Sequence, residues 1–152
     1  GAPYEKSFAH IWLSRSNDLI HWGEHRPLLK RGFVPWNGLK VGPTVPIKTE
    51  KGWLEIIHGV QNTFCAFRYS LGALLLDLEN PEKILGCMKS YLLTPETEYE
   101  HLGVIPEVCF ATGAVVEPET RQLRIYYGGA DTTINLATGN VDEIVEWCLE
   151  GK

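Results

Sequence analysis

Residues Gly42 to Gly59, GPTVPIKTEKGWLEIIHG, have the pattern of a β-hairpin. Two extended runs flank the polar tip Thr49-Glu50-Lys51-Gly52, which has the composition of a tight turn. Lys40 stands just before the first run, and His58 stands at the end of the second. Because the strands of a hairpin are antiparallel, the two basic residues lie at the same end of it. We expect a functional site at that shared end.

The overall composition is that of one modest globular domain. The 152 residues are 44% hydrophobic and 22% charged, which is enough apolar material for a real core. The net charge of −5 argues against a nucleic-acid-binding surface, because phosphate backbones select for basic surfaces. The sequence has no apolar run of about 18 residues, so no membrane-spanning segment is predicted.

The four cysteines are Cys65, Cys87, Cys109 and Cys148. They show neither the CxxC pairs nor the histidine spacing of a zinc site, so no metal site is expected. We interpret them as buried thiols in a reducing compartment, and we expect a cytoplasmic protein. No phosphate-loop glycine run and no Ser-His-Asp order is present either.

Outward from the hairpin, short extended runs alternate with turn residues. Residues 53–59 (WLEIIHG) and 123–129 (LRIYYGG) repeat one pattern 70 positions apart. A repeating unit of about 60–70 residues with four short antiparallel strands is typical of a β-propeller blade. The sequence therefore predicts an all-β chain. The strands are expected at 8–13, 19–22, 64–78, 83–86, 108–116, 123–128 and 132–138, and a short C-terminal helix at 141–149.

The number of blades is too small for closure. About two and a half blades are present, whereas a propeller needs about four to eight. We therefore interpret residues 1–152 as the C-terminal part of a single propeller domain whose N-terminal blades lie upstream; the alternative is a small β-domain of another kind. Open blade edges lead us to expect self-association of this piece. The assignment is the back half of a blade at 1–30, a whole blade at 40–95 and most of a third at 106–140, with boundaries near 30–40 and 95–106.

Several motifs follow one another in a characteristic order. They are KVGP at 40–43, PIKT at 46–49, GWL at 52–54, HGV at 58–60, LGALLLDLENP at 71–81, YE at 99–100, GVIP at 103–106 and YYGGADT at 126–132. Together they resemble glycoside hydrolase family 130, the mannoside phosphorylases. The resemblance runs from about residue 8 to the end, and it is nearest to the subgroup that acts on β-mannosides and β-1,4-mannooligosaccharides.

The resemblance implies a five-bladed β-propeller with its site at the axial mouth. It implies a glycosyltransferase-type phosphorylase that cleaves a β-mannosidic bond with inorganic phosphate and releases α-mannose 1-phosphate with inversion. The partners are then a mannoside or mannooligosaccharide and phosphate, and no metal or organic cofactor is implied. Some relatives are hydrolases. A β-mannoside hydrolase and a non-catalytic sugar-binding propeller fragment therefore remain as alternatives.

The resemblance also assigns roles to three residues. Lys40 and His58 belong to the phosphate cradle, which needs cationic donors because phosphate is already a nucleophile. Asp131 matches an aspartate that hydrogen-bonds the sugar. The alternative is a purely structural role for each residue: Lys40 as a solvated surface lysine, His58 as a histidine of the core, and Asp131 as a turn residue. The family's general acid lies in an earlier blade and has no counterpart here, so no catalytic residue is assigned and the isolated chain is expected to be inactive.

The tryptophans fall into two groups. Trp12, Trp22 and Trp53 lie on predicted strands and are expected in the cores of blades. Trp36 lies instead in an irregular loop just before Lys40. We expect Trp36 to be exposed and to contact sugar.

Two departures from the family pattern concern the expected site. After Lys40, the run GPTVP is one residue shorter than the glycine-proline run usual in the family. Glu107 stands where the family often has asparagine. An acid in place of an amide near the mouth is expected to alter sugar recognition.

Overall fold

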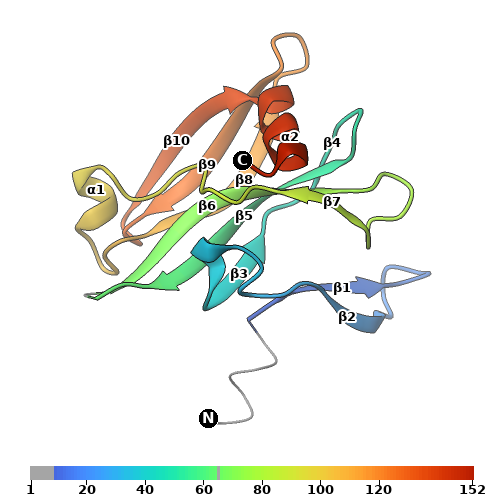
Figure 1. Ribbon diagram of the computed structural model, residues 1–152, viewed down its shortest axis with the longest axis horizontal. Helices are drawn as coiled ribbons and strands as arrows, with labels where there is room; N and C mark the ends of the chain where they lie inside the picture. Colours follow the sequence, from blue (N-terminus) through green and yellow to red (C-terminus); the bar gives the residue numbers. More distant parts are fainter. Residues whose placement is uncertain (1–8, 65) are drawn as a thin grey trace.

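The structure, a computed structural model, describes residues 9–64 and 66–152, and Figure 1 shows its strands gathered into separate antiparallel sheets. A two-stranded sheet (β1-β2), a five-stranded sheet (β3-β5-β6-β7, with β4 also on β5) and a three-stranded sheet (β10-β9-β8) follow one another. The elements are β1 (Ile11–Arg15), β2 (Gly23–Leu29), the 3-10 helix η2 (Pro35–Asn37), β3 (Lys40–Pro43), β4 (Ile47–Lys48), β5 (Trp53–Asn62), β6 (Phe67–Leu76), β7 (Ile84–Cys87), α1 (Glu98–His101), β8 (Cys109–Val116), β9 (Gln122–Gly129), β10 (Thr133–Asn140) and α2 (Val141–Glu150).

The hairpin quoted at the outset lies in the central sheet, as predicted. Both β3 and β4 pair with β5 in antiparallel register. The tip closes at Thr49, whose backbone N–H and hydroxyl both donate to the carbonyl of Gly52, at 2.9 and 2.7 Å. The turn composition of the tip was therefore a sound guide to the hairpin.

The strands β5 and β6 are buried on both faces. On one face Leu54, Ile56 and Leu71 pack with the third sheet and α2. On the other face Ile57 and Leu74 pack with the first hairpin and η2. This two-sided burial explains why the sequence there is a near-continuous apolar run rather than an alternating one.

Helix α2 closes the core on the third sheet. Asn140 caps it, since its side-chain oxygen accepts hydrogen bonds from the N–H groups of Asp142 and Glu143 at 2.8 and 3.3 Å. Gly151, with φ of 66°, ends it in the left-handed conformation. Val141, Ile144, Val145 and Cys148 face the core, which confirms the predicted terminal helix.

The first hairpin departs from the sequence prediction. Residues 19–22 form a turn rather than a strand, because the Asp18 carboxylate accepts hydrogen bonds from the N–H groups of Ile20 and His21 at 2.9 and 2.8 Å. The strand follows instead at β2. Trp12 and Trp22 are 45% and 54% exposed among the described residues. The prediction that they lie in the core of a blade is therefore wrong.

The predicted all-β class is confirmed, with little helix. The sheets are open, and no closed propeller is formed by residues 9–64 and 66–152. Five blades and their boundaries stay predictions. No helix in the described part of the chain combines the length and apolarity needed to cross a membrane.

Candidate functional site

Lys40 and His58 lie at the same end and on the same face of the central sheet. Lys40 pairs with Val60, and Gly42 pairs with His58. Residues two apart on a strand share a face, so the ammonium and the imidazole project to the same side. Lys40 is exposed, whereas His58 is only 6% exposed. The expectation that the hairpin brings these two residues together is therefore met.

Tyr69 joins them from the next strand. It pairs with Val60 across the β5–β6 ladder, so it lies diagonal to His58 on the shared face. The Lys40 Nζ lies 5.8 Å from the centroid of the Tyr69 ring, and the rings of His58 and Tyr69 are 6.4 Å apart. No sequence motif had pointed to Tyr69. Its position follows from the β5–β6 register.

The third sheet supplies the other wall of a hollow of about 280 Å³. Phe110 of β8 lies against His58, with ring centroids 4.3 Å apart. Asp131 lies in the turn between β9 and β10 and lines the same hollow as Lys40. Two residues that are 91 positions apart in the sequence thus share one site. The lining is Lys40, Tyr69, Ile105, Val108, Phe110 and Asp131.

Asp131 belongs to a tight turn whose position is fixed. Ala130 and Asp131 have φ of 45° and 51°, and the Thr132 N–H donates to the carbonyl of Gly129 at 2.9 Å. The N–H of Ile105 donates to the Ala130 carbonyl at 3.2 Å and so ties the hollow's wall to this turn. Within the described residues the Asp131 carboxylate makes no hydrogen bond and is exposed, so it is free to accept from a ligand.

The imidazole of His58 is held close against the backbone. A Cβ on Gly42 would lie 2.5 Å from its Cε1, so only glycine leaves room for the ring there. Neither ring nitrogen has a partner among the described residues. Burial, with the neighbouring Lys40 charge, lowers the pKa of His58 to about 4. At neutral pH the ring is therefore uncharged, and it offers one nitrogen as a donor and the other as an acceptor to a ligand.

This low pKa predicts that the chain loses stability on acidification. The unfolded chain protonates His58 below its ordinary value of 6.5, whereas the folded chain resists down to about 4. The free energy of unfolding is expected to fall by about 3 kcal/mol across that window. Urea unfolding of the chain and of His58→Gln at several pH values measures it as a difference. Taking the difference removes the contribution of Glu55, because both proteins contain it. The raised pKa of Glu55 would by itself increase the free energy of unfolding as the pH falls. Parallel pH profiles would contradict the assignment.

Trp36 is not part of the site, and its expected exposure is wrong. The side chain is 2% exposed and lies in the core between the central sheet and the first hairpin. The indole fills the space that the missing side chains of Gly59 and Gly72 leave on the central sheet. This is the face opposite to His58, because residues 58 and 59 of one strand point to opposite faces. The loop before Lys40 therefore buries its tryptophan rather than presenting it.

Glu107 fixes the rim of the hollow. Its carboxylate binds Arg68 Nε at 3.1 Å and His101 Nδ1 at 2.5 Å, and its carbonyl accepts from the Tyr69 N–H at 2.9 Å. Burial opposes ionisation of this carboxyl, but His101 and Arg68 outweigh it and lower its pKa. Glu107 thus connects the wall that carries Tyr69 to the wall that carries Val108 and Phe110.

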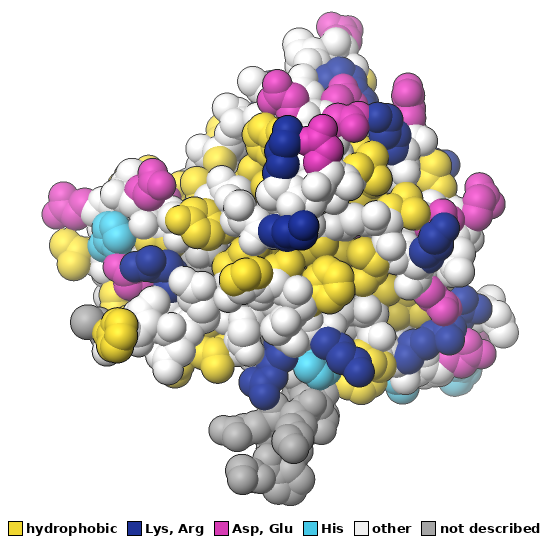
Figure 2. Space-filling model, in the orientation of Figure 1, with side chains coloured by type: hydrophobic (Ala, Val, Ile, Leu, Met, Phe, Trp, Pro, Cys, Tyr) yellow, Lys and Arg dark blue, Asp and Glu magenta, His cyan; other side chains and the backbone are white. Residues whose placement is uncertain are grey.

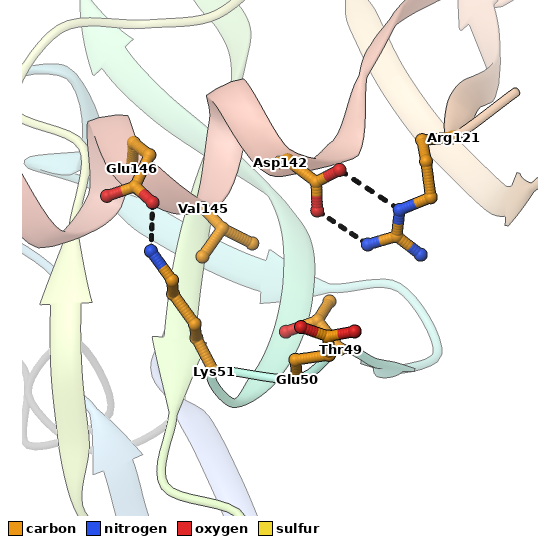
Figure 3. A pocket seen from close by; sticks show the side chains of 7 residues that line it. All are labelled: Thr49, Glu50, Lys51, Arg121, Asp142, Val145 and Glu146. Carbon is orange, nitrogen blue, oxygen red and sulfur yellow. Dashed lines mark hydrogen bonds and ion pairs between the residues drawn. The ribbon is translucent and has the colours of Figure 1, made fainter.

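A second hollow, of about 250 Å³, lies between the hairpin tip and α2 (Figure 3). Lys51 binds Glu146 there, and Arg121 binds Asp142 through two hydrogen bonds of 3.0 and 2.5 Å. Each cation is already matched by an acid, which makes this hollow a poor anion site. Figure 2 likewise shows basic and acidic side chains interspersed on one face of the molecule.

Comparisons with known proteins point to one family. A family model described as beta-1,4-mannooligosaccharide phosphorylase matches residues 4–150. The chain is 36% identical to the beta-1,4-mannooligosaccharide phosphorylase of Ruminococcus albus over 92% of its own length and 42% of the relative's. It is 41% identical to a beta-1,2-mannobiose phosphorylase of Listeria innocua over 89% of its length and 37% of the relative's.

Solved structures show the same fold. The chain matches the Listeria innocua beta-1,2-mannobiose phosphorylase, solved with beta-1,2-mannobiose, with a TM-score of 0.82 and 39% identity, covering 91% of this chain and 38% of that one. A glycosyl hydrolase from Bacteroides ovatus shares the fold alone, with a TM-score of 0.75 and 22% identity over 88% of this chain and 41% of that one. The chain spans about two fifths of the curated relatives it matches. It belongs to glycoside hydrolase family 130.

Proposed function

We propose that this chain provides the phosphate-binding part and a piece of the sugar-binding part of a mannoside phosphorylase. The observation that carries the proposal is that Lys40 and Asp131 line one hollow between two sheets, with His58 buried beside it against Phe110. The reaction is cleavage of a β-mannosidic bond by inorganic phosphate, with inversion, to give α-mannose 1-phosphate. The proposal needs no metal or organic cofactor. We place the protein in the cytoplasm.

The charge of each residue suits it to a different part of the substrates. The exposed ammonium of Lys40 binds the phosphate dianion, and the uncharged His58 and the Tyr69 hydroxyl each donate one hydrogen bond to it. Asp131 accepts hydrogen bonds from sugar hydroxyls. Val108 and Phe110 keep water from the phosphate side. Holding phosphate in line behind the anomeric carbon is the contribution of this chain, while protonation of the leaving oxygen falls to an acid elsewhere in the longer protein.

The experiment is an assay of the longer polypeptide that contains this chain. It is incubated with β-1,4-mannobiose or β-1,2-mannobiose, with and without phosphate, and mannose 1-phosphate is measured. We expect phosphate-dependent product. We expect Lys40→Ala to lower kcat/KM for phosphate by about 10- to 100-fold, because it removes a charge-assisted contact to phosphate and such contacts contribute roughly 1.5–3 kcal/mol. Lys48→Ala, which removes an exposed lysine from the same hairpin, is the matched control.

A second variant tests the imidazole without removing any ionisable group. Gly42→Ala displaces the His58 ring, because the new Cβ would lie 2.5 Å from Cε1, and it should raise KM for phosphate. Free mannose formed equally well without phosphate would identify a hydrolase. No product under either condition would favour a non-catalytic sugar-binding fragment. In both cases Lys40 would be interpreted as a surface lysine and His58 as a histidine of the core.

A further inference from the structure

Glu107 lies at the edge of β6, between two residues that line the hollow of the candidate site. Ile105 and Val108 line that hollow, whereas Glu107 is not among its lining residues in the described part of the chain. The two oxygens of its carboxylate are occupied instead, by Arg68 Nε at 3.1 Å and by His101 Nδ1 at 2.5 Å. Glu107 can therefore act on a ligand in the hollow only through its neighbours.

The backbone of Glu107 is held in an unfavourable conformation. Its φ is 62°, in the left-handed region, where a residue with a Cβ is strained. Asparagine and aspartate tolerate this region better, because their short side chains bond to the nearby backbone. The longer Glu107 side chain reaches past the backbone to Arg68 and His101. Strained positions persist where the surrounding contacts fix them, and they cluster at functional sites.

Glu107 holds β6 at two adjacent positions. Its carboxylate binds the side chain of Arg68, and its carbonyl accepts a hydrogen bond from the N–H of Tyr69 at 2.9 Å. Consecutive residues of a strand point to opposite faces, so Arg68 lies on one face while the Tyr69 ring lies on the other and lines the hollow. Glu107 thus fixes the strand at the residue that carries the phenol.

The contact with His101 fixes Glu107 itself. His101 ends α1, and the carbonyl of Glu100 on the same helix accepts a hydrogen bond from the N–H of Val108 at 3.2 Å. Burial opposes ionisation of Glu107, but His101 and Arg68 outweigh it and lower its pKa, so the carboxylate is charged at neutral pH. A charged carboxylate has two acceptor oxygens, one for each partner, whereas an amide has only one.

We propose that Glu107 is a positioning residue of the phosphate site, which holds the Tyr69 hydroxyl in place through Arg68. The proposal rests on the proposed function, in which that hydroxyl donates a hydrogen bond to phosphate. It differs in sign from a simple effect of charge. An acid that acted only by its charge would repel a dianion, so its removal would strengthen phosphate binding, and removal of Arg68 would weaken it. Removal of either partner of a positioning pair weakens phosphate binding.

The test measures phosphorolysis of mannobiose by the longer polypeptide that contains this chain, with phosphate as the varied substrate. Glu107→Gln and Arg68→Gln, which change the net charge in opposite directions, should each raise KM for phosphate by about 10-fold and change kcat by less than about 2-fold, as expected when one hydrogen bond to phosphate is lost. In a Tyr69→Phe background, each change should alter KM by less than about 2-fold, because the positioned hydroxyl is absent.

Asp142→Asn is the matched control. It breaks a pair of similar geometry, the two hydrogen bonds to Arg121 at 3.0 and 2.5 Å, beside the second hollow. It should leave KM for phosphate unchanged. A further measurement on the same proteins needs no catalysis: the amide of Tyr69 should exchange its hydrogen at least about 10-fold faster in Glu107→Gln than in the unsubstituted polypeptide, and at an unchanged rate in Asp142→Asn.

Three outcomes would overturn the proposal. The first is a KM for phosphate that moves in opposite directions in Glu107→Gln and Arg68→Gln, which would identify an effect of charge alone. The second is a full rise of KM in the Tyr69→Phe background. The third is unchanged exchange of the Tyr69 amide in Glu107→Gln. These results differ from failure of the proposed function, in which the unsubstituted polypeptide itself forms no mannose 1-phosphate with phosphate present.

Discussion

Gly72→Ala is expected to lower the free energy of unfolding by about 3 kcal/mol, at the upper end of what overpacking costs. The new Cβ would lie 2.3 and 2.4 Å from Cζ2 and Cη2 of Trp36. The indole is 2% exposed and is confined by Gly59 on the neighbouring strand, so it cannot swing aside. Either β6 must shift or Trp36 must leave its slot.

Urea unfolding of the isolated chain measures this effect. Gly113→Ala is the matched control, because residue 113 also lies on a strand but a Cβ there meets no atom within 4 Å. Its effect should stay within about 0.5 kcal/mol. In a Trp36→Ala background the cost of Gly72→Ala should largely vanish, since the clash has gone. An unchanged cost in that background would show that the glycine is needed for another reason.

Glu100→Leu is expected to cost about 4 kcal/mol, because it removes the acceptor of three buried or half-buried donors. The carboxylate, 2% exposed, accepts from the N–H groups of Glu96 and Thr97, both at 2.8 Å, and from the Tyr127 hydroxyl at 2.7 Å. Burial opposes its ionisation, yet these hydrogen bonds prevail and lower its pKa. Leucine fills similar space and satisfies none of the donors.

Thermal and urea unfolding of Glu100→Leu and of Glu98→Leu distinguish the loss of these hydrogen bonds from a general effect of replacing an acid on helix α1. Glu98 is exposed on the same helix, so its replacement should cost under about 1 kcal/mol. Tyr127→Phe, which removes a single donor and leaves the acid ionised, should fall between the two. Equal losses at positions 98 and 100 would mean that the buried hydrogen bonds contribute little.

The candidate site was predictable where it depended on one hairpin. Turn residues at the tip fixed the antiparallel pairing, and that pairing brought Lys40 and His58 to one end. Tyr69 was missed because its place depends on how β6 registers against β5. The burial of Trp36 depends on two glycines, Gly59 and Gly72, that become neighbours only after β5 and β6 have paired.

Two local errors have different causes. The apolar run 19–22 looked like a strand, but the Asp18 side chain captured its backbone N–H groups and made a turn. Helix α1 was overlooked although its signal is present in the sequence. Thr97 followed three residues later by Glu100 is the pattern of a capping box, and the Glu100 carboxylate does accept from the Thr97 N–H.

The buried thiols make the chain a reporter of its own unfolding. Cys87 belongs to the core against the first hairpin, whereas Cys109 and Cys148 belong to the core against the third sheet. Burial raises the pKa of all three, to about 11 for Cys87 and about 12 for Cys148, so these three cysteines offer almost no thiolate to an alkylating reagent while the chain is folded; Cys65 lies outside the described residues. Peptide-resolved iodoacetamide labelling then times the opening of each core separately. Equal rates at the three positions would mean that the two cores open as one cooperative unit, and unequal rates would show which opens first.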